Sequence, residues 1–360
     1  MTLHPTITPR PGVLDISPYV GGESEAKGAN RVFKLSANEN PLGPSVQAIE
    51  AFRATGETLG LYPDGGHLAL RQAIAEVHGI EPERIVCGSG SDEIISLLCK
   101  AYSGPGDEVL YSRHGFLMYA ISGLAAGATP VTAPETDLTA DIDALIAAMT
   151  YRTRLVFLAN PNNPTGTMVP MAEVERLADA IPPRALLVLD SAYAEYVEGY
   201  DGGIALVRAR ENVVMTRTFS KIYGLGSQRL GWGYAPEHVV DVLNRVRGPF
   251  NVTSGALAAG EAAMRDQDWI AHCRAENAKW RAWLAEELAA LGIATAQSFG
   301  NFVLAKIGEG AAACHDHLAV RGVLVRRMDG YGLAPHLRIS IGDEEGCRAV
   351  IEGVRDWQSQ

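Results

Sequence analysis

Lys221 stands among hydroxyl and basic residues in a pattern that suits imine chemistry. It ends the segment Thr218–Lys221, and Arg229 follows eight residues later. A lysine amine attacks carbonyl groups when it is desolvated or close to other cations. Asp190, at the end of an apolar run, and Tyr193 add a carboxylate and a phenol. These residue types predict a site that forms imines with carbonyl compounds and binds anions. The alternative is a solvated Lys221 and a structural ion pair at Arg229.

A second candidate is the small-residue segment Gly88–Glu93, which joins an expected strand to an expected helix. Small residues let the backbone approach an anion, and a helix N-terminus offers unpaired N–H groups. The segment has neither the Gly-Lys-Ser/Thr of a Walker loop nor the third glycine of a dinucleotide fingerprint. It predicts a phosphate-binding turn, the alternative being a helix start capped by Ser91.

A third candidate is the turn Asn160–Gly166, directly after the apolar run 155–158. Its two prolines fix φ and its glycine permits a tight turn, so the backbone amides are held rigidly. Ligands of open α/β sheets bind at the carboxyl ends of strands, where this turn is expected to lie. The alternative is a plain connecting turn.

The elements that must position these residues follow an α/β pattern. Short runs that are apolar on both faces alternate with amphipathic helical patterns, which is typical of a mostly parallel sheet covered by helices. The expected strands are 85–87, 109–111, 155–158, 186–189 and 213–215, and the expected helices are 68–77, 92–100, 142–149 and 173–180.

The chain changes character after residue 245, which predicts a second, smaller α/β unit. The pattern there gives a long helix over 268–291, strands at 302–307, 323–325 and 337–341, and helices at 314–320 and 344–356. The proline-rich start has little periodicity, which suits an arm laid on other surfaces. The expected division is an N-terminal arm joining the small domain (1–40), a large domain (41–245) and a small domain (246–360).

Composition excludes several classes of protein. The 360 residues include 31 Lys and Arg against 42 Asp and Glu, for a formal charge of −11, and 47% are hydrophobic. So much apolar material argues against disorder, and the acidic balance argues against a nucleic-acid partner. No apolar run approaches a membrane span, and the N-terminus has no signal-peptide pattern. Five scattered cysteines fit a reduced, cytoplasmic protein.

The segment Cys314–His317 resembles a metal site in composition only. Residues two apart on a helix do not share a face, and no second group of ligands stands near it in the sequence. No metal is therefore expected.

Taken in order, the motifs resemble those of the fold-type-I pyridoxal-phosphate enzymes, and within them the aminotransferases of the histidinol-phosphate aminotransferase family. The resemblance runs from about residue 16 to residue 341, nearly the whole chain. The matching pieces are the segments 35–44, 62–64, 90–93, 162–166 and 337–340, the pair Asp190 and Tyr193, and Ser220-Lys221 with Arg229.

The resemblance implies pyridoxal phosphate as cofactor and a role for each matching residue. It makes Lys221 the amine that binds the cofactor covalently and moves the substrate's proton, and it makes Asp190 the partner of the pyridine nitrogen. Asn163 and Tyr193 would bind the cofactor's 3′ oxygen, and Phe116 would stack on its ring. The residues implied for the phosphate are Ser91, Asp92, Glu93, Thr218, Ser220 and Arg229. Lys221, Asp190 and Tyr193 form the implied catalytic set.

The resemblance also implies the substrate side and a partner. Arg338 and Arg326 would bind the anionic end of the substrate, with Tyr19 and Asn163 beside it. Tyr62 matches a tyrosine that reaches the cofactor phosphate of a second subunit, which implies a homodimer. The sequence departs from the family pattern at Arg113–Gly115 and at residues 20–22, both on the substrate side.

The implied reaction is amino transfer between L-glutamate/2-oxoglutarate and histidinol phosphate/imidazole acetol phosphate, a step of histidine biosynthesis. The partners are thus a small amino donor and a 2-oxo acid, without nucleic acid or membrane. Alternatives are an aromatic or prephenate-type aminotransferase and a decarboxylase of the threonine-phosphate type. A regulatory module without turnover is a further alternative, and the absence of a helix-turn-helix segment or basic arm argues against it.

Overall fold

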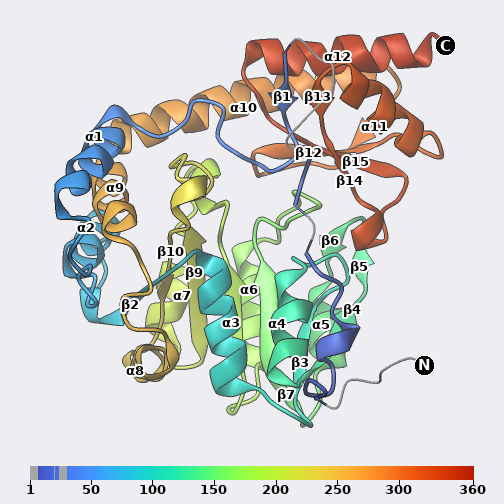
Figure 1. Ribbon diagram of the computed structural model, residues 1–360. Helices are drawn as coiled ribbons and strands as arrows, with labels where there is room; N and C mark the ends of the chain where they lie inside the picture. Colours follow the sequence, from blue (N-terminus) through green and yellow to red (C-terminus); the bar gives the residue numbers. More distant parts are fainter. Residues whose placement is uncertain (1–6, 20, 24–30) are drawn as a thin grey trace.

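The computed structural model describes residues 7–19, 21–23 and 31–360. The remaining positions of the expected arm, 1–6, 20 and 24–30, lie outside the described residues. The centre of the molecule is a seven-stranded sheet (Figure 1). Its strands, in spatial order, are β2 (Ile85–Gly88), β10 (Gly231–Tyr234), β9 (Val213–Thr218), β8 (Leu186–Asp190), β7 (Thr153–Ala159), β3 (Glu108–Ser112) and β4 (Thr129–Ala133).

The direction of the strands brings the predicted chemistry to one edge of this sheet. The neighbours β4, β3, β7, β8 and β9 are parallel, whereas β10 is antiparallel to both β9 and β2. β2 therefore points the same way as β9, and the carboxyl ends of β2, β3, β7, β8 and β9 share an edge. The five expected strands are confirmed. β4 and β10 were not predicted, because β4 contains Pro130 and is half exposed, and β10 alternates glycine with aromatic residues.

Helices cover both faces of the sheet, so its strands are apolar on both sides. In β8 the side chains of Leu187 and Leu189 belong to one buried cluster, and those of Leu186 and Val188 to the other. This alternation follows from the two-residue repeat of a strand. α2 (Leu68–His78), α5 (Ile142–Ala148), α6 (Met171–Ala180) and α7 (Ile204–Ala209) pack on one face, and α3 (Ser91–Tyr102), α4 (Met118–Ala126) and α8 (Glu237–Val246) on the other. The expected α/β class is confirmed.

The C-terminal residues build a second, antiparallel sheet with a core of its own. Its strands, in spatial order, are β11 (Ala294–Thr295), β12 (Phe302–Lys306), β15 (His336–Ser340) and β14 (Arg326–Arg327). Beside it, β1 (Phe33–Lys34) pairs in parallel with β13 (Val323–Leu324), so the start of the chain joins this small unit. Its helices are α10 (Gln267–Ala290), α11 (Ala311–Val320) and α12 (Glu344–Gln358).

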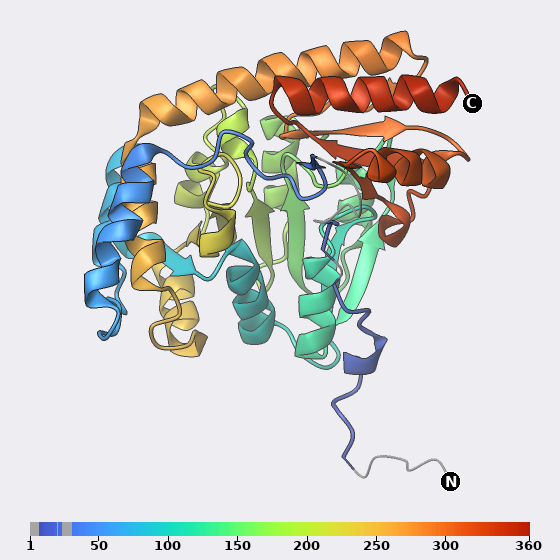
Figure 2. The same ribbon diagram turned by 45° about the horizontal axis from the view of Figure 1, so that its top comes forward.

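The long helix α10 bridges the two units (Figures 1 and 2). It starts next to α9 (Ser254–Arg265), which packs against α1 (Val46–Ala54) and α2, and it ends beside the small sheet. The boundary expected at residue 245 stays a prediction. Within the described part of the chain, no helix is long and apolar enough to cross a membrane.

Short elements complete the chain. β5 (Glu135–Thr136) pairs with β6 (Thr139–Ala140) in a hairpin after β4. Single 3-10 turns lie at η1 (Val13–Asp15), η2 (Thr55–Thr58), η3 (Pro82–Arg84), η4 (Ala194–Tyr196), η5 (Gly226–Gln228) and η6 (Asp329–Tyr331).

Candidate active site

A cleft of about 1300 Å³ lies at the carboxyl edge of the large sheet, closed on one side by residues of the small unit. The loops after β7, β8 and β9 and the start of α3, which follows β2, meet there because all four strands end at this edge. The cleft brings together most of the residues singled out in the sequence: Tyr19, Ser91, Asp92, Phe116, Asn163, Asp190, Tyr193, Thr218, Ser220, Lys221, Arg229, Arg326 and Arg338.

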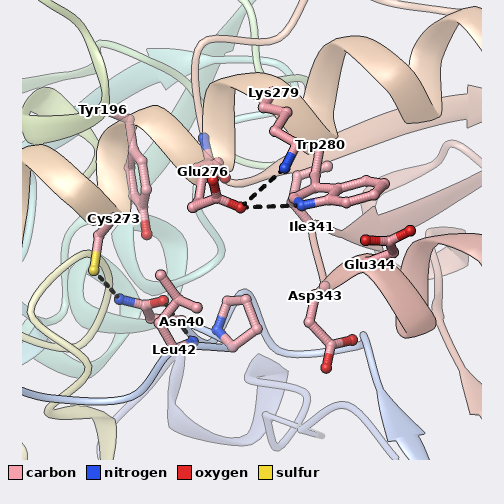
Figure 3. A pocket seen from close by; sticks show the side chains of 13 residues that line it. Asn40, Leu42, Tyr196, Cys273, Glu276, Lys279, Trp280, Ile341, Asp343 and Glu344 are labelled. Atoms are coloured by element: carbon pink, nitrogen blue, oxygen red, sulfur yellow. Dashed lines mark hydrogen bonds and ion pairs between the residues drawn. The ribbon is translucent and has the colours of Figure 1, made fainter.

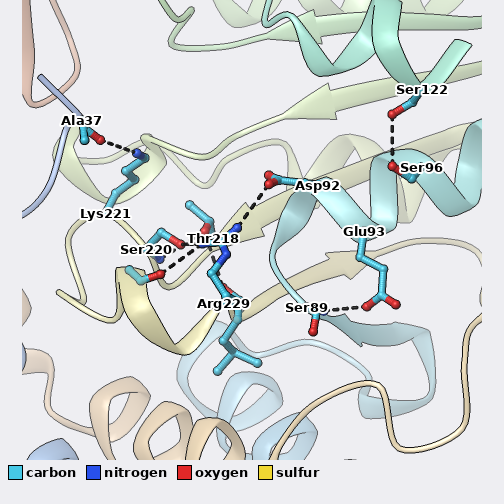
Figure 4. Close-up of polar contacts among 12 residues, drawn as sticks. Ala37, Ser89, Asp92, Glu93, Ser96, Ser122, Thr218, Ser220, Lys221 and Arg229 are labelled. Carbon is cyan, nitrogen blue, oxygen red and sulfur yellow. Dashed lines mark hydrogen bonds and ion pairs between the residues drawn. The ribbon is translucent and has the colours of Figure 1, made fainter. Parts of the chain in front are cut away.

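Lys221 follows β9 and turns its amine into this cleft. The Nζ atom donates a hydrogen bond to the carbonyl oxygen of Ala37 at 3.3 Å (Figure 4) and lies 5.8 Å from the centre of the Tyr193 ring. Burial, helped by the positive charge of Arg338, lowers the pKa of Lys221 from 10.5 to about 8. The neutral form of the amine, which a nucleophile requires, therefore predominates above about pH 8 instead of above pH 10.5. The alternative of a solvated surface lysine is wrong.

Asp190 ends β8 and is only 5% exposed. Its Oδ2 accepts a hydrogen bond from the hydroxyl of Tyr119 at 2.6 Å, and its Oδ1 accepts one from Thr216 Oγ1 at 3.3 Å. Burial raises the pKa of the carboxyl, and these hydrogen bonds oppose the rise. Tyr119 carried no signal in the sequence, because it lies inside an apolar helical pattern.

The start of α3 and the loop of Lys221 form a cup that suits an anion. Arg229 donates to Ser220 Oγ at 3.0 Å and to Asp92 Oδ2 at 3.1 Å (Figure 4). The helix is capped by Gly90, at φ 86°, without a side-chain cap, so the reading of Ser91 as the cap is wrong. The free N–H groups of the first turn and the guanidinium of Arg229 are the donors that a phosphate group prefers.

The opposite side of the cleft carries the guanidinium of Arg338, from β15. Its Nη1 donates to Asn163 Oδ1 at 2.6 Å and its Nη2 to the carbonyl oxygen of Ser36 at 2.9 Å. Arg338 is 5% exposed, and its Nε is buried without a partner among the described residues. The guanidinium of Arg326 lies 5.6 Å from the centre of the Tyr19 ring. Both arginines of the expected substrate side thus face one cleft.

Tyr193 is held by a residue that the sequence reasoning did not single out. Asn38 donates from Nδ2 to the hydroxyl of Tyr193 at 3.0 Å, and its own N–H donates to Ser340 Oγ at 2.8 Å. The backbone of Asn38 is left-handed, with φ 55°. Burial raises the pKa of Tyr193, so its hydroxyl keeps its proton. The segment 35–44 contained the signal for Asn38, since it was among the matching motifs.

Glu93 and Tyr62 do not line the cleft of their own chain, and for Tyr62 the expectation concerned the cleft of a second subunit. The carboxylate of Glu93 accepts hydrogen bonds from the backbone of Ser89 at 2.6 Å and from Asn251 at 2.7 Å (Figure 4 shows the former), so it stabilises the turn instead of lining the cleft. Tyr62 is 83% exposed and stacks on Phe250, with ring centres 4.7 Å apart. Its neighbours in this exposed apolar patch are Phe52, Leu59 and Leu61.

A second cavity lies between α10, the segment after β1 and the start of α12 (Figure 3). Glu276 accepts a hydrogen bond from Trp280 Nε1 at 3.2 Å and pairs with Lys279 at 3.6 Å. Asn40 donates to Cys273 Sγ at 3.3 Å on its other side. None of the site residues expected from the sequence lines this cavity. Within the described ranges, no group of three or more His, Cys, Asp or Glu could hold a metal ion.

The described side chains of the large cleft supply four functions at once: an amine of lowered pKa, a buried carboxylate, a phosphate cup and a pair of guanidinium groups. The cup suits the phosphate of a carbonyl-bearing ligand, the buried carboxylate suits a cationic group on the same ligand, and the two guanidinium groups suit a second, anionic ligand. The arrangement can hold such a ligand at both ends while the amine reacts in the middle.

Comparison of the sequence and the fold with known proteins points to one family, the aminotransferases. Residues 30–354 match the family model described as aminotransferase class I and II. The chain is 61% identical to a histidinol-phosphate aminotransferase of Dinoroseobacter shibae over 98% of its own length and 99% of that protein. It is 59% identical to one of Ruegeria sp., with 98% of each chain covered. A crystal structure of histidinol-phosphate aminotransferase from Sinorhizobium meliloti in complex with pyridoxal-5'-phosphate superimposes with a TM-score of 0.86, at 29% identity over 91% of each chain.

Proposed function

The chain belongs to the family of class I and II aminotransferases, and we propose that it transfers an amino group between histidinol phosphate and 2-oxoglutarate. The products are imidazole acetol phosphate and L-glutamate, and the reaction belongs to histidine biosynthesis. One observation carries the proposal. Lys221, Asp190, Arg229 and Arg338 converge on a single cleft in a chain 57–61% identical to several histidinol-phosphate aminotransferases.

The residues of the cleft fit pyridoxal phosphate. Asp190 is a buried carboxylate whose side-chain hydrogen bonds come from the hydroxyls of Tyr119 and Thr216, with no basic partner among the described residues, and such a group suits a protonated ring nitrogen. The cup at the start of α3 is shaped for an anion: a Cβ atom on Gly90 would lie 2.7 Å from Arg229 Nη2. Phe116 lines the same cleft and is the aromatic side chain that would stack on the cofactor ring.

Each residue has a role that follows from its position. The bound cofactor supplies an electron-withdrawing ring and an aldehyde carbon that takes up the amino group. Lys221 would hold the cofactor covalently, and its free amine would be the base that takes the proton from the substrate's α carbon. Asp190 would keep the ring nitrogen protonated, and Tyr193 and Asn163 would donate hydrogen bonds to the 3′ oxygen. The cofactor phosphate would be held by the cleft residues at the start of α3 and around Lys221, with Glu93 supporting their turn; these residues are Ser91, Asp92, Thr218, Ser220 and Arg229.

The substrate side is positively charged. Arg338 and Arg326 are separate guanidinium groups on paired strands, at register positions opposite one another in β15 and β14. Arginine binds phosphates and carboxylates through two parallel hydrogen bonds, which a lysine cannot reproduce. Both groups therefore suit an enzyme that accepts a phosphate-bearing amine and a dicarboxylate in turn. Tyr19 and Asn163 border the same space.

We also propose that the enzyme is a cytoplasmic homodimer. The exposed apolar patch around Tyr62 contains Leu59 and Leu61, which are 84% and 71% exposed. Contiguous apolar surface of this kind marks an interaction site. A second copy seated on this patch would cover it and bring Tyr62 to the cofactor phosphate of the other subunit. Five buried, unpaired cysteines are consistent with a reducing compartment.

Steady-state kinetics tests the function. The purified protein should be yellow when loaded with pyridoxal phosphate and should show a higher kcat/KM for histidinol phosphate than for phenylalanine. K221A should abolish turnover and the covalent cofactor, and K279A, which removes a lysine that is 60% exposed, should change neither. A higher kcat/KM for phenylalanine would make the protein an aromatic aminotransferase, and release of carbon dioxide would make it a decarboxylase.

A further inference from the structure

Tyr119 is a buried phenol bonded to the carboxylate of Asp190. Its side chain has no exposed area, and its hydroxyl donates to Asp190 Oδ2 at 2.6 Å. Its ring stacks on Phe157, with centres 4.5 Å apart and planes 8° from parallel. Stacking on one side and a short hydrogen bond at the tip leave the phenol a single orientation. The bond joins α4 to the end of β8, across 71 residues of sequence.

The same ring also supports a second wall of the cleft. Tyr119 meets Phe116 edge-on, with ring centres 5.9 Å apart and planes 89° from parallel. Phe116 and Asp190 both line the cleft, whereas Tyr119 does not. Tyr119 therefore contacts the two side chains assigned to the cofactor ring while staying outside the cleft itself.

The charges around Asp190 show what the hydroxyl does. Burial is the main cause that raises the pKa of Asp190, and the negative charge of Asp92, from α3, raises it further. The hydrogen bonds from Tyr119 and Thr216 lower it. Tyr193, on the loop after β8, is a neutral phenol nearby. Burial and the charge of Asp190 raise the pKa of Tyr119 far above its usual value, so its hydroxyl remains a donor at every physiological pH.

We propose that Tyr119 is a positioning residue, whose hydroxyl holds the carboxylate of Asp190 in the orientation and ionised state that bind the protonated ring nitrogen of pyridoxal phosphate. The proposal rests on the proposed function, which supplies the cofactor. A hydrogen bond to a charged group contributes more than one between neutral groups, and loss of one donor leaves a buried carboxylate oxygen unpaired. Without the hydroxyl, the carboxyl of Asp190 is protonated at a higher pH. Once protonated, it no longer forms an ion pair with the ring nitrogen.

The test compares Y119F with a matched control, Y111F. Tyr111 is also buried, and its ring meets that of Tyr119 at 5.9 Å. The dissociation constant of pyridoxal phosphate is measured by equilibrium dialysis of the cofactor-free proteins between pH 5 and pH 9. We expect Y119F to bind at least about tenfold more weakly at pH 7, with the acid limb of its binding profile moved to higher pH. Y111F should stay within about twofold of the wild type at every pH.

A double-mutant cycle separates positioning from packing. If the hydroxyl acts through the carboxylate, Y119F should cost less than about twofold in a D190N background. An equal loss in both backgrounds would show that Tyr119 acts through packing alone. Wild-type protein that fails to bind pyridoxal phosphate overturns the proposed function, and the present proposal with it. Wild-type binding with unchanged affinity in Y119F overturns the present proposal only.

A second variant covers the case in which Y119F does not fold. Incorporation of 3-fluorotyrosine at position 119 keeps the ring and makes the hydroxyl a stronger donor. We expect the acid limb of cofactor binding to move to lower pH, opposite to Y119F. An unmoved acid limb contradicts the proposal.

Discussion

Arg338 Nη1 donates a hydrogen bond to Asn163 Oδ1 at 2.6 Å. The bond joins the small sheet to the turn after β7, so it crosses between the two units at the candidate site. The second hydrogen bond of Arg338 goes to the backbone of Ser36, which precedes the loop that carries Asn38. The guanidinium of Arg338 thus links β15 of the small unit to the turn after β7 and to the segment after β1.

We expect R338K to weaken substrate binding. Lysine keeps the charge but cannot make two parallel hydrogen bonds, and a hydrogen bond to a charged group contributes about 1.5–3 kcal/mol. The KM for histidinol phosphate should therefore rise about 10- to 100-fold in steady-state assays, with a smaller effect on kcat. R355K, the same change at an exposed position of α12, is the control and should leave KM unchanged. A normal KM in R338K would show that Arg338 does not bind the substrate.

The amine of Lys221 should become reactive at a lower pH than an ordinary lysine. Burial lowers its pKa to about 8, so the neutral form predominates above pH 8 instead of above pH 10.5. In the cofactor-free protein, acetylation of Lys221, followed by mass spectrometry, should rise tenfold per pH unit up to about pH 8 and then level off. Nα-acetyl-lysine in the same solution is the control, and its labelling should keep rising to about pH 10. A profile for Lys221 that matches the control contradicts the assignment.

The cup at the start of α3 should be sensitive to a single methyl group. In G90A the new Cβ would lie 2.7 Å from Arg229 Nη2, which must move away. We expect the dissociation constant of pyridoxal phosphate to rise about tenfold or more, measured by dialysis, if one charged hydrogen bond is lost.

G106A separates this effect from backbone strain. Gly106 has φ 92°, close to the 86° of Gly90, and a Cβ there meets nothing within 4 Å. Alanine in such a backbone costs roughly 1–3 kcal/mol of stability, so both variants should melt at a lower temperature. Only G90A should bind pyridoxal phosphate more weakly. Equal affinities in the two variants would contradict the assignment of the start of α3 and Arg229 to the cofactor phosphate.

The exposed apolar patch around Tyr62 should hold two subunits together. L61D places a charge in the patch, and burying an unpaired charge at an interface is strongly unfavourable. We expect sedimentation to show a dimer for the wild type and a monomer for L61D, with weaker cofactor binding in the monomer. V320D is the control, because Val320 is 77% exposed on α11, compared with 71% for Leu61. Equal sedimentation of both variants would exclude this patch as the interface.

The sequence was sufficient for the strands whose side chains are buried on both faces and for the motifs at their ends. β8 is an apolar run closed by Asp190, and β7 is one closed by the turn of Asn163, so a local pattern predicts both. It was insufficient for β10, whose glycines carry no apolar pattern, and its strand character comes from pairing with β2 and β9. Pairing partners far apart in the chain leave no local signal.

The amino-acid sequence by itself determined the α/β class, the motif order, and the chemical types of Lys221, Asp190, Arg229 and Arg338. Only the tertiary structure decided how these groups act on one another. It lowered the pKa of Lys221 by burial, gave Asp190 the hydroxyl of Tyr119, and turned Glu93 away from the cleft. Burial and hydrogen-bond geometry depend on elements brought together from distant parts of the chain, so no local run of residues encodes them.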